Sequence, residues 1–554
     1  RYSRAQRLAR AVRRHRGASI AGAAVAIALV AAAVAVTRAQ RGHPWLPVVH
    51  PLDAVEEDSS GASFSPDGRQ LVFDSTRAPG HQQVFVGPLD GPARQISHAE
   101  QFAAYPRFHG DDHILYTTHR GLVEQSLTTG TIRPLFDGFA NYGDDCAGRV
   151  VAWHEIPNER FGATELAMVD DSGVRSLLRI PPRKDVYWLR CDRAGKRVVY
   201  SLADRMLLGP TAEIWMLDLA TGATKLVTTG ERRGPTFDPD GKTIVFSAAR
   251  GGPINLWEIP IDGGVAQQLT FGAGPDMAPD ISRDGSRLVF SVDNTSVPIV
   301  EYSLDHPPRR LTPEIDRVRW IAVSDDGELL VSQVERHRTE QIVVRSLRTG
   351  EERVLGTGMT PAFDPGGHTV VWTADDRLVT APAAGGAPRT LARLPGAART
   401  VAIGPDHVAH TMVFPDSGAG IEAWSVAWDG TARREASAPY AVLIPAPAGG
   451  WIAAQRTDGV ELVPPGDVLG APGHRMVRDF GGWDRDGRSF VALEADGVVR
   501  YQVATGEPQR LMDVEQGAQT VTVAPDGRTF YVARVIGQVT RHVITNFGDR
   551  PRPR

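Results

Sequence analysis

Aspartates that recur in one short motif are the residues with the most obvious chemical potential. The segment Pro-Asp-Gly stands in FSPDGRQLVF (64–73), in FDPDGKTIVF (237–246) and in VAPDGRTFYV (523–532). A carboxylate can act as a general acid or base, or bind a cation, but in a turn it also caps free backbone N–H groups. Because near-copies return about every 40 residues, as structural repeats do, we interpret these aspartates as turn residues.

Other groups with chemical potential are few. Asp484-Arg485-Asp486-Gly487 resembles the start of a calcium loop but coincides with the repeated turn and lacks the remaining ligands. His407 and His410 are spaced as metal ligands could be, although scattered surface histidines are the simpler interpretation. The chain lacks G-x-S-x-G, H-E-x-x-H, C-x-x-C and phosphate-loop motifs. We therefore predict no catalytic residue, no metal site and no cofactor in this chain.

The two cysteines, Cys146 and Cys191, leave two interpretations open. Cys191 takes the place of Phe64 in its copy of the repeat, and Cys146 has a comparable place in the copy before. Equivalent positions of neighbouring repeats face each other, so a disulfide between them is one interpretation. The other is a pair of buried free thiols, since free cysteine behaves as a small hydrophobic residue.

The elements that position these residues are short strands. Pro and Gly set the turn in Ser65-Pro66-Asp67-Gly68, and Leu71 and Phe73 then share one face of a strand. A second half follows, as in NLWEIPIDGGVAQQLT (255–270), which reads as strand, turn and strand. Further copies are ISRDGSRLVF (281–290), VSDDGELLVS (323–332), FDPGGHTVVW (363–372) and WDRDGRSFVA (483–492). Four strands in about 40 residues are typical of a propeller blade.

This pattern resembles the blade repeat of the TolB-type β-propellers, relatives of the WD-type propellers, over roughly residues 50–547. The resemblance implies an all-β chain of about twelve four-stranded blades. Because single rings commonly hold four to eight blades, we expect two rings of six, or less simply seven and five. The orphan strand at 44–52 and a final unit that ends at RHVITNF (541–547) predict that the two ends of the chain pair and close a ring.

The first 41 residues differ from the rest. RYSRAQRLARAVRRHRG is strongly basic, and ASIAGAAVAIALVAAAVAV (18–36) is uncharged and long enough to cross a bilayer as a helix. A single transmembrane helix is our prediction, with a cleaved signal peptide or a buried soluble helix as alternatives. The excess of arginine before the span places the N-terminus in the cytoplasm and the propellers outside, at the inner membrane.

These observations predict six segments along the chain. They are a basic cytoplasmic segment (1–17), a transmembrane helix (18–36), a linker (37–44), a first propeller (45–313), a second propeller (314–547) and a disordered tail (548–554).

Partner binding is expected in loops that depart from the repeat. The segments FANYGDDC (139–146) and NERFGATE (158–165) carry aromatic and acidic residues, and Tyr142 and Phe161 are the candidate contacts, or else ordinary variable loops. Proteins or a small ligand at a propeller face, and the membrane, are the expected partners. The formal net charge of −4 argues against nucleic acid.

The basic and apolar start resembles the juxtamembrane and membrane-spanning region of bacterial receptor-like serine/threonine protein kinases. The chain begins at Arg1 inside a basic segment, so we expect a cytoplasmic domain before it. The resemblance implies a non-catalytic extracytoplasmic sensor or docking module of a single-span signalling protein. There are two alternatives. One is a TolB-like periplasmic scaffold that binds other envelope proteins, and the other is the C-terminal part of a membrane-bound winged-helix transcriptional regulator. Kinase activity would belong to the missing domain.

Overall fold

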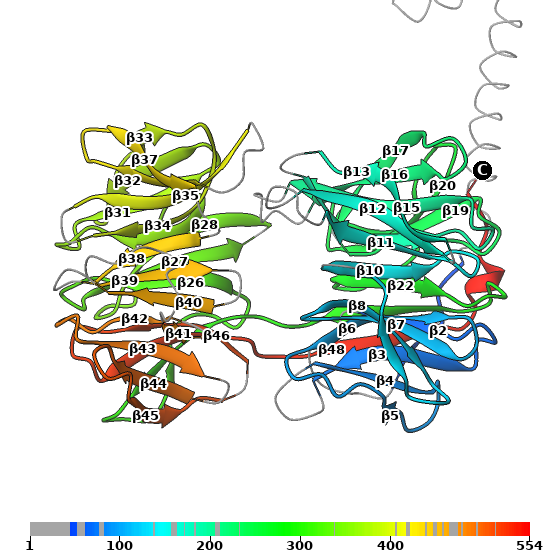
Figure 1. Cartoon of the computed structure of the whole chain (residues 1–554), viewed down its shortest axis with the longest axis horizontal. Helices are drawn as coiled ribbons and strands as arrows, with labels where there is room; N and C mark the ends of the chain where they lie inside the picture. Colours follow the sequence, from blue (N-terminus) through cyan, green and yellow to red (C-terminus); the bar gives the residue numbers. More distant parts are fainter. Residues whose placement is uncertain are drawn as a thin grey trace, which may run out of the picture.

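Twelve antiparallel sheets, each of four strands, make up the part of the chain that the structure describes (Figure 1). The computed structural model describes residues 45–52, 61–76, 82–136, 139–156, 163–170, 172–181, 184–204, 211–231, 233–336, 338–404, 407–416, 422–437, 440–446, 451–456, 459–464, 475–477, 480–494, 497–515 and 517–553. Within these ranges the one helical element is the short 3-10 helix η1 (Phe547–Asp549). The prediction of an all-β chain with propeller repeats is confirmed.

Six of the sheets form one closed ring, called here the first ring. Its first two sheets contain β2 (Ala62–Phe64), β3 (Gln70–Ser75), β4 (Gln83–Pro88) and β5 (Arg94–Gln95), then β6 (Ala103–His109), β7 (His113–Thr118), β8 (Gly121–Ser126) and β9 (Ile132–Pro134). The next two contain β10 (Ala140–Asp145), β11 (Val150–Glu155), β12 (Thr164–Asp170) and β13 (Gly173–Arg179), then β14 (Lys184–Cys191), β15 (Arg197–Asp204), β16 (Thr211–Asp218) and β17 (Thr224–Glu231). The last two contain β18 (Thr236–Phe237), β19 (Thr243–Ala248), β20 (Asn255–Pro260) and β21 (Gln267–Gln268), then β22 (Asp276–Ile281), β23 (Leu288–Asp293), β48 (Val539–Ile544) and β1 (Val49–Pro51).

The other six sheets form the second ring. One contains β46 (Ala518–Val523), β47 (Thr529–Arg534), β24 (Ile299–Ser303) and β25 (Arg309–Arg310), and the next contains β26 (Arg317–Val323), β27 (Leu329–Arg336), β28 (Thr339–Ser346) and β29 (Glu352–Thr357). Two more contain β30 (Met359–Phe363), β31 (Thr369–Ala374), β32 (Arg377–Pro382) and β33 (Arg389–Arg393), then β34 (Gly396–Ile403), β35 (Ala409–Pro415), β36 (Glu422–Val426) and β37 (Ala432–Ser437). The last two contain β38 (Tyr440–Pro445), β39 (Ile452–Arg456), β40 (Gly459–Val463) and β41 (Arg475–Val477), then β42 (Gly482–Trp483), β43 (Ser489–Glu494), β44 (Gly497–Gln502) and β45 (Pro508–Asp513).

The repeated turn forms as its sequence predicts. Ser65 Oγ donates to Asp67 Oδ1 at 2.6 Å, and the same oxygen accepts the N–H of Arg69 at 3.0 Å. Gly68 has a φ of 71°, the left-handed backbone that glycine tolerates best. These hydrogen bonds lower the pKa of Asp67, with the bond from Ser65 as the main cause. The recurring aspartate is therefore a structural group.

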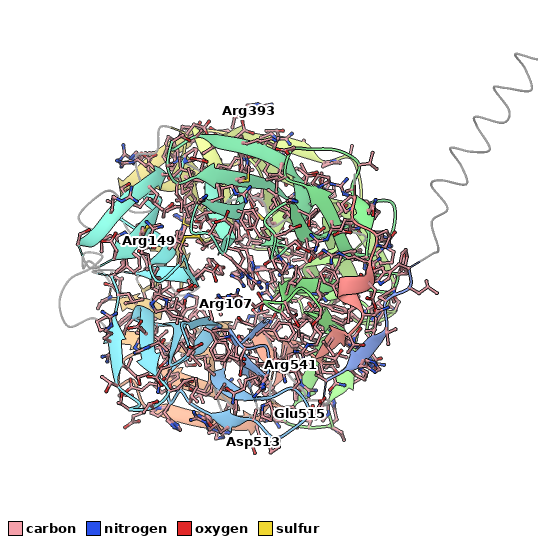
Figure 2. All side chains as sticks on the ribbon, turned by 90° about the vertical axis from the view of Figure 1, so that its right-hand side faces the viewer. Arg107, Arg149, Arg393, Asp513, Glu515 and Arg541 are labelled. Carbon is pink, nitrogen blue, oxygen red and sulfur yellow. A yellow bond between two sulfur atoms is a disulfide. The ribbon has the colours of Figure 1, made fainter. Side chains whose placement is uncertain are left out.

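Neighbouring sheets pack through aliphatic and aromatic side chains. Val72 and Val84 of one sheet, for example, share a buried cluster with Phe108 and Ile114 of the next. Burial of such surfaces is the main stabilising contribution to each ring. The two rings lie side by side along the longest axis in Figure 1, and the 90° view in Figure 2 looks onto the first ring.

The chain passes between the rings twice. It leaves the first ring after β23, builds the whole second ring from β24 to β47, and returns with β48. The two crossing segments pair with each other, since the N–H groups of Ser296 and Ile536 each donate to the carbonyl of the other at 2.9 Å. The second ring is thus inserted into the first. This differs from the predicted boundary at 313/314, because β24 and β25 belong to a sheet of the second ring and β48 to one of the first.

The first and the last strand that the structure describes meet in the first ring. β48 lies between β23 and β1, so the predicted pairing of the strand at 44–52 with the final unit is observed. Asn546 reinforces the junction: its side chain accepts the N–H of Val48 at 2.8 Å and donates to the carbonyl of Leu46 at 3.0 Å. In Figure 1, β48 is red and lies beside the blue strands of the first ring.

The prediction of a disordered tail is wrong for residues 548–553. Phe547 is fully buried, and the Arg550 side chain is 1% exposed. Arg550 forms ion pairs with the buried carboxylates of Asp238 and Glu258, the second at 2.9 Å. Strong buried ion pairing therefore holds the tail against the first ring.

In the part of the chain that the structure describes, no helix has the length and apolar character needed to cross a membrane. The predicted span at 18–36, with the flanking segments 1–17 and 37–44, lies outside the described residues.

Candidate functional site

The inner strand of every sheet places one equivalent residue at the axis of its ring. In each inner strand, one residue begins the hairpin turn by donating its N–H across the turn, as Ser65 does to the carbonyl of Gln70. The equivalent residue at the axis stands two positions earlier, which is Ser63 in this sheet. In the first ring all six equivalent residues are polar and line one cavity of about 500 Å³. They are Ser63, Arg107, Asp144, Arg190, Thr236 and Asp280, and we call them the polar ring.

The second ring has an uncharged and largely apolar set at the same place. Its equivalent residues also line one cavity, of about 530 Å³. They are Ala322, Ala362, Ala402, Ile444, Gly482 and Thr522. The two rings therefore share an architecture but differ in the chemistry of the axis. Charged groups at this position are not needed to build the blades, which makes the first ring the stronger candidate site.

Arg107 joins three sheets of the first ring. Its Nε donates to Asp144 Oδ1 at 2.8 Å and its Nη1 donates to Asp280 Oδ1 at 2.8 Å. Burial opposes the charge of the guanidinium, but the two carboxylates, Asp280 first, outweigh burial and raise the pKa of Arg107. Figure 2 shows Arg107 near the middle of the ring.

The remaining oxygens of both carboxylates bind the backbone. Asp144 Oδ2 accepts the N–H of Cys191 at 2.8 Å, and Asp280 Oδ2 accepts the N–H of Phe64 at 2.9 Å. Each aspartate therefore connects its own sheet to the following one. Since all four oxygens already accept a hydrogen bond, this part of the polar ring is internally satisfied.

Arg190 has a different environment from Arg107. Arg190 is 5% exposed. Its Nη1 donates to the carbonyl of Leu189 at 2.7 Å, and its guanidinium lies 4.3 Å from the ring centroid of Trp188. Its Nε has no hydrogen-bond partner. Burial and, next, the charge of Arg107 lower the pKa of Arg190 to about 9. Within the described ranges, no carboxylate forms an ion pair with it.

Aromatic residues lie beside the polar ring. The ring centroids of Tyr105 and Tyr142 are 4.7 Å apart, and both lie 6.1 Å from that of Trp188. Tyr142 is part of β10 and has a φ of 54° at a register shift of that strand. Burial, with a smaller effect of Tyr105, raises the pKa of Tyr142 well above its usual value. Because Tyr142 is part of β10 and packs against Tyr105 and Trp188, the prediction that it lies in a loop is wrong.

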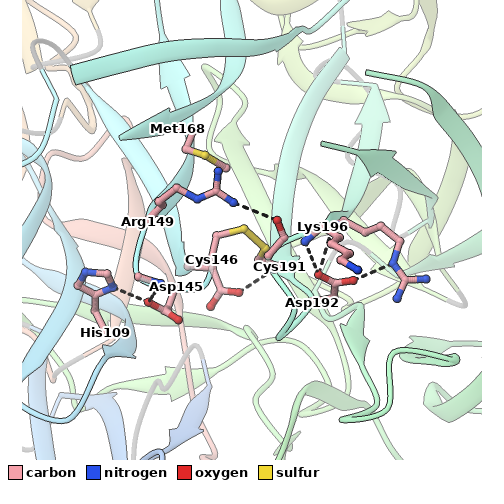
Figure 3. Close-up of a disulfide and its surroundings, with 12 residues drawn as sticks. His109, Asp145, Cys146, Arg149, Met168, Cys191, Asp192 and Lys196 are labelled. Carbon is pink, nitrogen blue, oxygen red and sulfur yellow. Dashed lines mark hydrogen bonds and ion pairs between the residues drawn. A yellow bond between two sulfur atoms is a disulfide. The ribbon is translucent and has the colours of Figure 1, made fainter. Parts of the chain in front are cut away.

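Figure 3 shows a disulfide, and one of its cysteines, Cys191, also lines the cavity of the polar ring. The disulfide joins Cys146, just after β10, to Cys191 at the end of β14, with 5.3 Å between the Cα atoms. It thus connects the same two sheets as the hydrogen bond from Cys191 to Asp144. Of the two interpretations that the sequence left open, the structure contains the disulfide. Beside it, Arg149 Nη2 donates to the carbonyl of Gly195 at 3.0 Å.

The other sequence candidates have ordinary partners. His410 Nδ1 lies 3.4 Å from Glu435 Oε2, and the N–H of His407 donates to the carbonyl of Gly404 in a turn. Asp484 pairs with Arg500 at 2.7 Å. Among the described residues, no group of three or more His, Cys, Asp or Glu side chains is arranged to hold a metal ion. Phe161 lies outside the described residues.

The polar ring was not predicted from the sequence. A signal was available, since Arg107 stands in AAYPRFH and Arg190 in VYWLRC, and an arginine inside a strand-forming run is unusual. That signal does not tell whether the side chain points to the axis or to solvent. The register of the inner strand decides this, and a one-residue shift would reverse it.

Comparison with known proteins supports the repeat. A family model described as the TolB beta propeller domain matches residues 165–406. An uncharacterised protein of Agrobacterium fabrum is 30% identical over 124 residues, which cover 22% of this chain and 39% of that protein. The uncharacterised peptidase YuxL of Bacillus subtilis is 29% identical over 180 residues, covering 30% of this chain and 25% of that protein. This chain thus spans well under half of each of these relatives.

Two solved structures also match parts of this chain, with low TM-scores. The putative TolB of Agrobacterium tumefaciens has 17% sequence identity and a TM-score of 0.31, over 48% of this chain and 85% of that one. The tricorn protease has 11% identity and a TM-score of 0.32, over 87% of this chain and 60% of that one. The match to the TolB beta propeller domain model covers residues 165–406, a little under half of the chain.

Proposed function

We propose that this chain is a TolB-like interaction module that works outside the cytoplasm, as the sensor or docking part of a membrane signalling protein. The observation that carries the proposal is the disulfide between Cys146 and Cys191. Disulfides persist in oxidising compartments and are rare in the cytosol of most organisms. A structural disulfide inside the first ring therefore fits a protein that folds after export.

The first 36 residues supply the second part of the proposal. An uncharged run at 18–36 follows a segment rich in arginine, which suits a single-pass anchor of the inner membrane with a cytoplasmic N-terminus. The resemblance of this region to receptor-like serine/threonine kinases favours a cytoplasmic kinase domain as the effector. In this arrangement the rings recognise a partner, and any catalysis belongs to the other side of the membrane.

A second candidate is a periplasmic scaffold that binds other proteins of the cell envelope. The match of residues 165–406 to the TolB beta propeller domain favours it. Both candidates place the rings outside the cytoplasm and differ in what precedes Arg1. A membrane-bound winged-helix regulator remains a third arrangement of the same kind.

Two measurements test the proposal. Alkaline phosphatase fused after Arg554 should be active in cells, because this enzyme needs an oxidising compartment, while a fluorescent protein that matures only in the cytoplasm should stay dark at that position. The reverse pattern would refute an extracytoplasmic module. The reading frame upstream of Arg1 separates the candidates: a Gly-rich loop and an H-R-D motif support the kinase, whereas a short leader supports the scaffold.

A further inference from the structure

We propose that the axis of the first ring is an oxyanion-binding site, in which Arg190 and Arg193 bind a carboxylate or phosphate group of a small ligand. Arg190 belongs to the polar ring, and Arg193 lines the same cavity of about 500 Å³. The inference does not depend on whether the chain serves a receptor or a scaffold.

Arg190 has unused capacity to donate hydrogen bonds. A guanidinium has five N–H groups, and one of them, on Nη1, meets a protein acceptor, the carbonyl of Leu189. The buried Nε has no partner. Nearby Asp144 and Asp280 cannot be recruited without loss, because each of their oxygens already accepts a bond from Arg107 or a backbone N–H.

Arg193 adds a second cation at the same cavity. Its Nη1 donates to the carbonyl of Arg283 and its Nη2 to the carbonyl of Ile281 at 3.4 Å. Within the described residues it also forms no ion pair with a carboxylate. Two arginines whose partners are carbonyl oxygens can each donate to an oxyanion, which arginine binds in a bidentate manner.

The fold of the ring does not require an arginine at the position of Arg190. The second ring closes with Ala322, Ala362 and Ala402 at equivalent places. A buried cation without a carboxylate is costly, and burial accordingly lowers the pKa of Arg190. Groups that reduce stability without a structural role are typical of functional sites.

The polar ring also has neutral donors. Ser63 and Thr236, both buried, belong to the lining of the cavity, and Ser63 Oγ makes a long hydrogen bond of 3.4 Å to the carbonyl of Phe64. Thr236 belongs to the sheet next to that of Arg190. A ligand anion near Arg190 would therefore meet guanidinium and hydroxyl donors together, the combination that neutralises and orients an oxyanion.

The test is isothermal titration calorimetry of the full chain in a non-ionic detergent, at constant ionic strength with chloride as the balancing ion. The probes are inorganic phosphate and succinate, titrated separately. We expect saturable binding of at least one probe by the natural protein. Arg190→Met, which keeps an unbranched apolar side chain but removes the charged guanidinium, should weaken binding about tenfold or more. Arg190→Lys, a second variant, keeps the charge without the planar fork and should weaken binding less.

The matched control is Arg393→Met, because the Arg393 side chain is 69% exposed and lies in the second ring. It should bind as the natural protein does. Saturation by phosphate alone identifies a phosphate ligand, saturation by succinate alone a carboxylate ligand, and saturation by both a general oxyanion site. The proposal is overturned if neither probe saturates, or if folded Arg190→Met binds as tightly as the natural protein.

Discussion

Arg107 Nη1 lies 2.8 Å from Asp280 Oδ1, although 173 residues separate them in the chain. The contact connects the second and sixth sheets of the first ring across its axis. Asp144, in the third sheet, binds the same guanidinium. One arginine side chain thus connects three sheets that share no backbone hydrogen bonds in the strand order of the ring.

Removal of Arg107 should destabilise the first ring. Arg107→Met leaves two buried carboxylates without their cation, and breaking a buried pair in this way costs about 3–5 kcal/mol. Urea denaturation measures the loss. Arg393→Met is the control and should change the free energy of unfolding by less than about 0.5 kcal/mol, as exposed substitutions usually do.

The triple variant Arg107→Met, Asp144→Asn, Asp280→Asn tests the reason for that loss. It removes all three charges, so much of the lost stability should return. If the triple variant is less stable than Arg107→Met, the penalty does not come from unpaired carboxylates.

The sequence predicted what depends on local residues. Each Pro-Asp-Gly turn fixes its own hairpin, so the number of blades and the pairing of the chain ends could be inferred from turns and strands such as those around Ser65 and Asp67. Contacts such as Arg107 with Asp280 depend on closure of the ring, which no local pattern encodes. Tyr142 was predicted to lie in a loop because its segment departs from the repeat. The departure is a register shift between Asn141 and Asp144 within a strand, and it brings Tyr142 into contact with other aromatic residues.

Tyr142 should contribute to stability through its ring. Tyr142→Ala removes the contacts with Tyr105 and Trp188 and should lower the free energy of unfolding by about 2 kcal/mol or more. Tyr142→Phe keeps the ring and is the matched control, with an effect well below that of alanine. If Tyr142→Ala and the natural protein were equally stable in thermal denaturation, the contacts of Tyr142 with Tyr105 and Trp188 would not contribute to stability.

Asp276 should make stability depend on pH. Burial raises its pKa from 3.8 to about 6, partly offset by a hydrogen bond from Thr270. The folded state therefore holds this proton more tightly than the unfolded chain. Its stabilising contribution is complete below about pH 3.8 and is lost as the pH rises through about 6.

Asp276→Asn removes this titration while it keeps the shape of the side chain. Relative to the natural protein, the variant should gain about 2 kcal/mol between pH 4 and pH 7, because part of the full difference, at 1.36 kcal/mol for each pKa unit, falls below pH 4. Asp284→Asn is the control, because hydrogen bonds, chiefly from Ser282, lower the pKa of exposed Asp284 to about 2. Its difference from the natural protein should stay constant over this range. If the difference in unfolding free energy between Asp276→Asn and the natural protein also stayed constant from pH 4 to pH 7, the raised pKa of Asp276 would be contradicted.

Arg550 should hold the C-terminal segment in place. Arg550→Met leaves the carboxylates of Asp238 and Glu258 buried and unpaired, which costs about 3–5 kcal/mol. Limited proteolysis should then cut the variant near Phe547, where the natural protein resists. The control is Arg528→Met, since Arg528 and its partner Asp305 are both largely exposed. Resistance of Arg550→Met equal to that of the control would argue against a structural tail.

The redox state of Cys146 and Cys191 in growing cells tests the central claim, an interaction module outside the cytoplasm, most directly. Cells are quenched in acid, their free thiols are alkylated with a maleimide large enough to shift the protein on a gel, and the sample is compared with one reduced before alkylation. The account predicts no shift before reduction and a shift of two maleimides after it, because the disulfide forms as the chain folds in an oxidising compartment. Two alkylated thiols in the sample that was never reduced would place the rings in a reducing compartment and contradict the account.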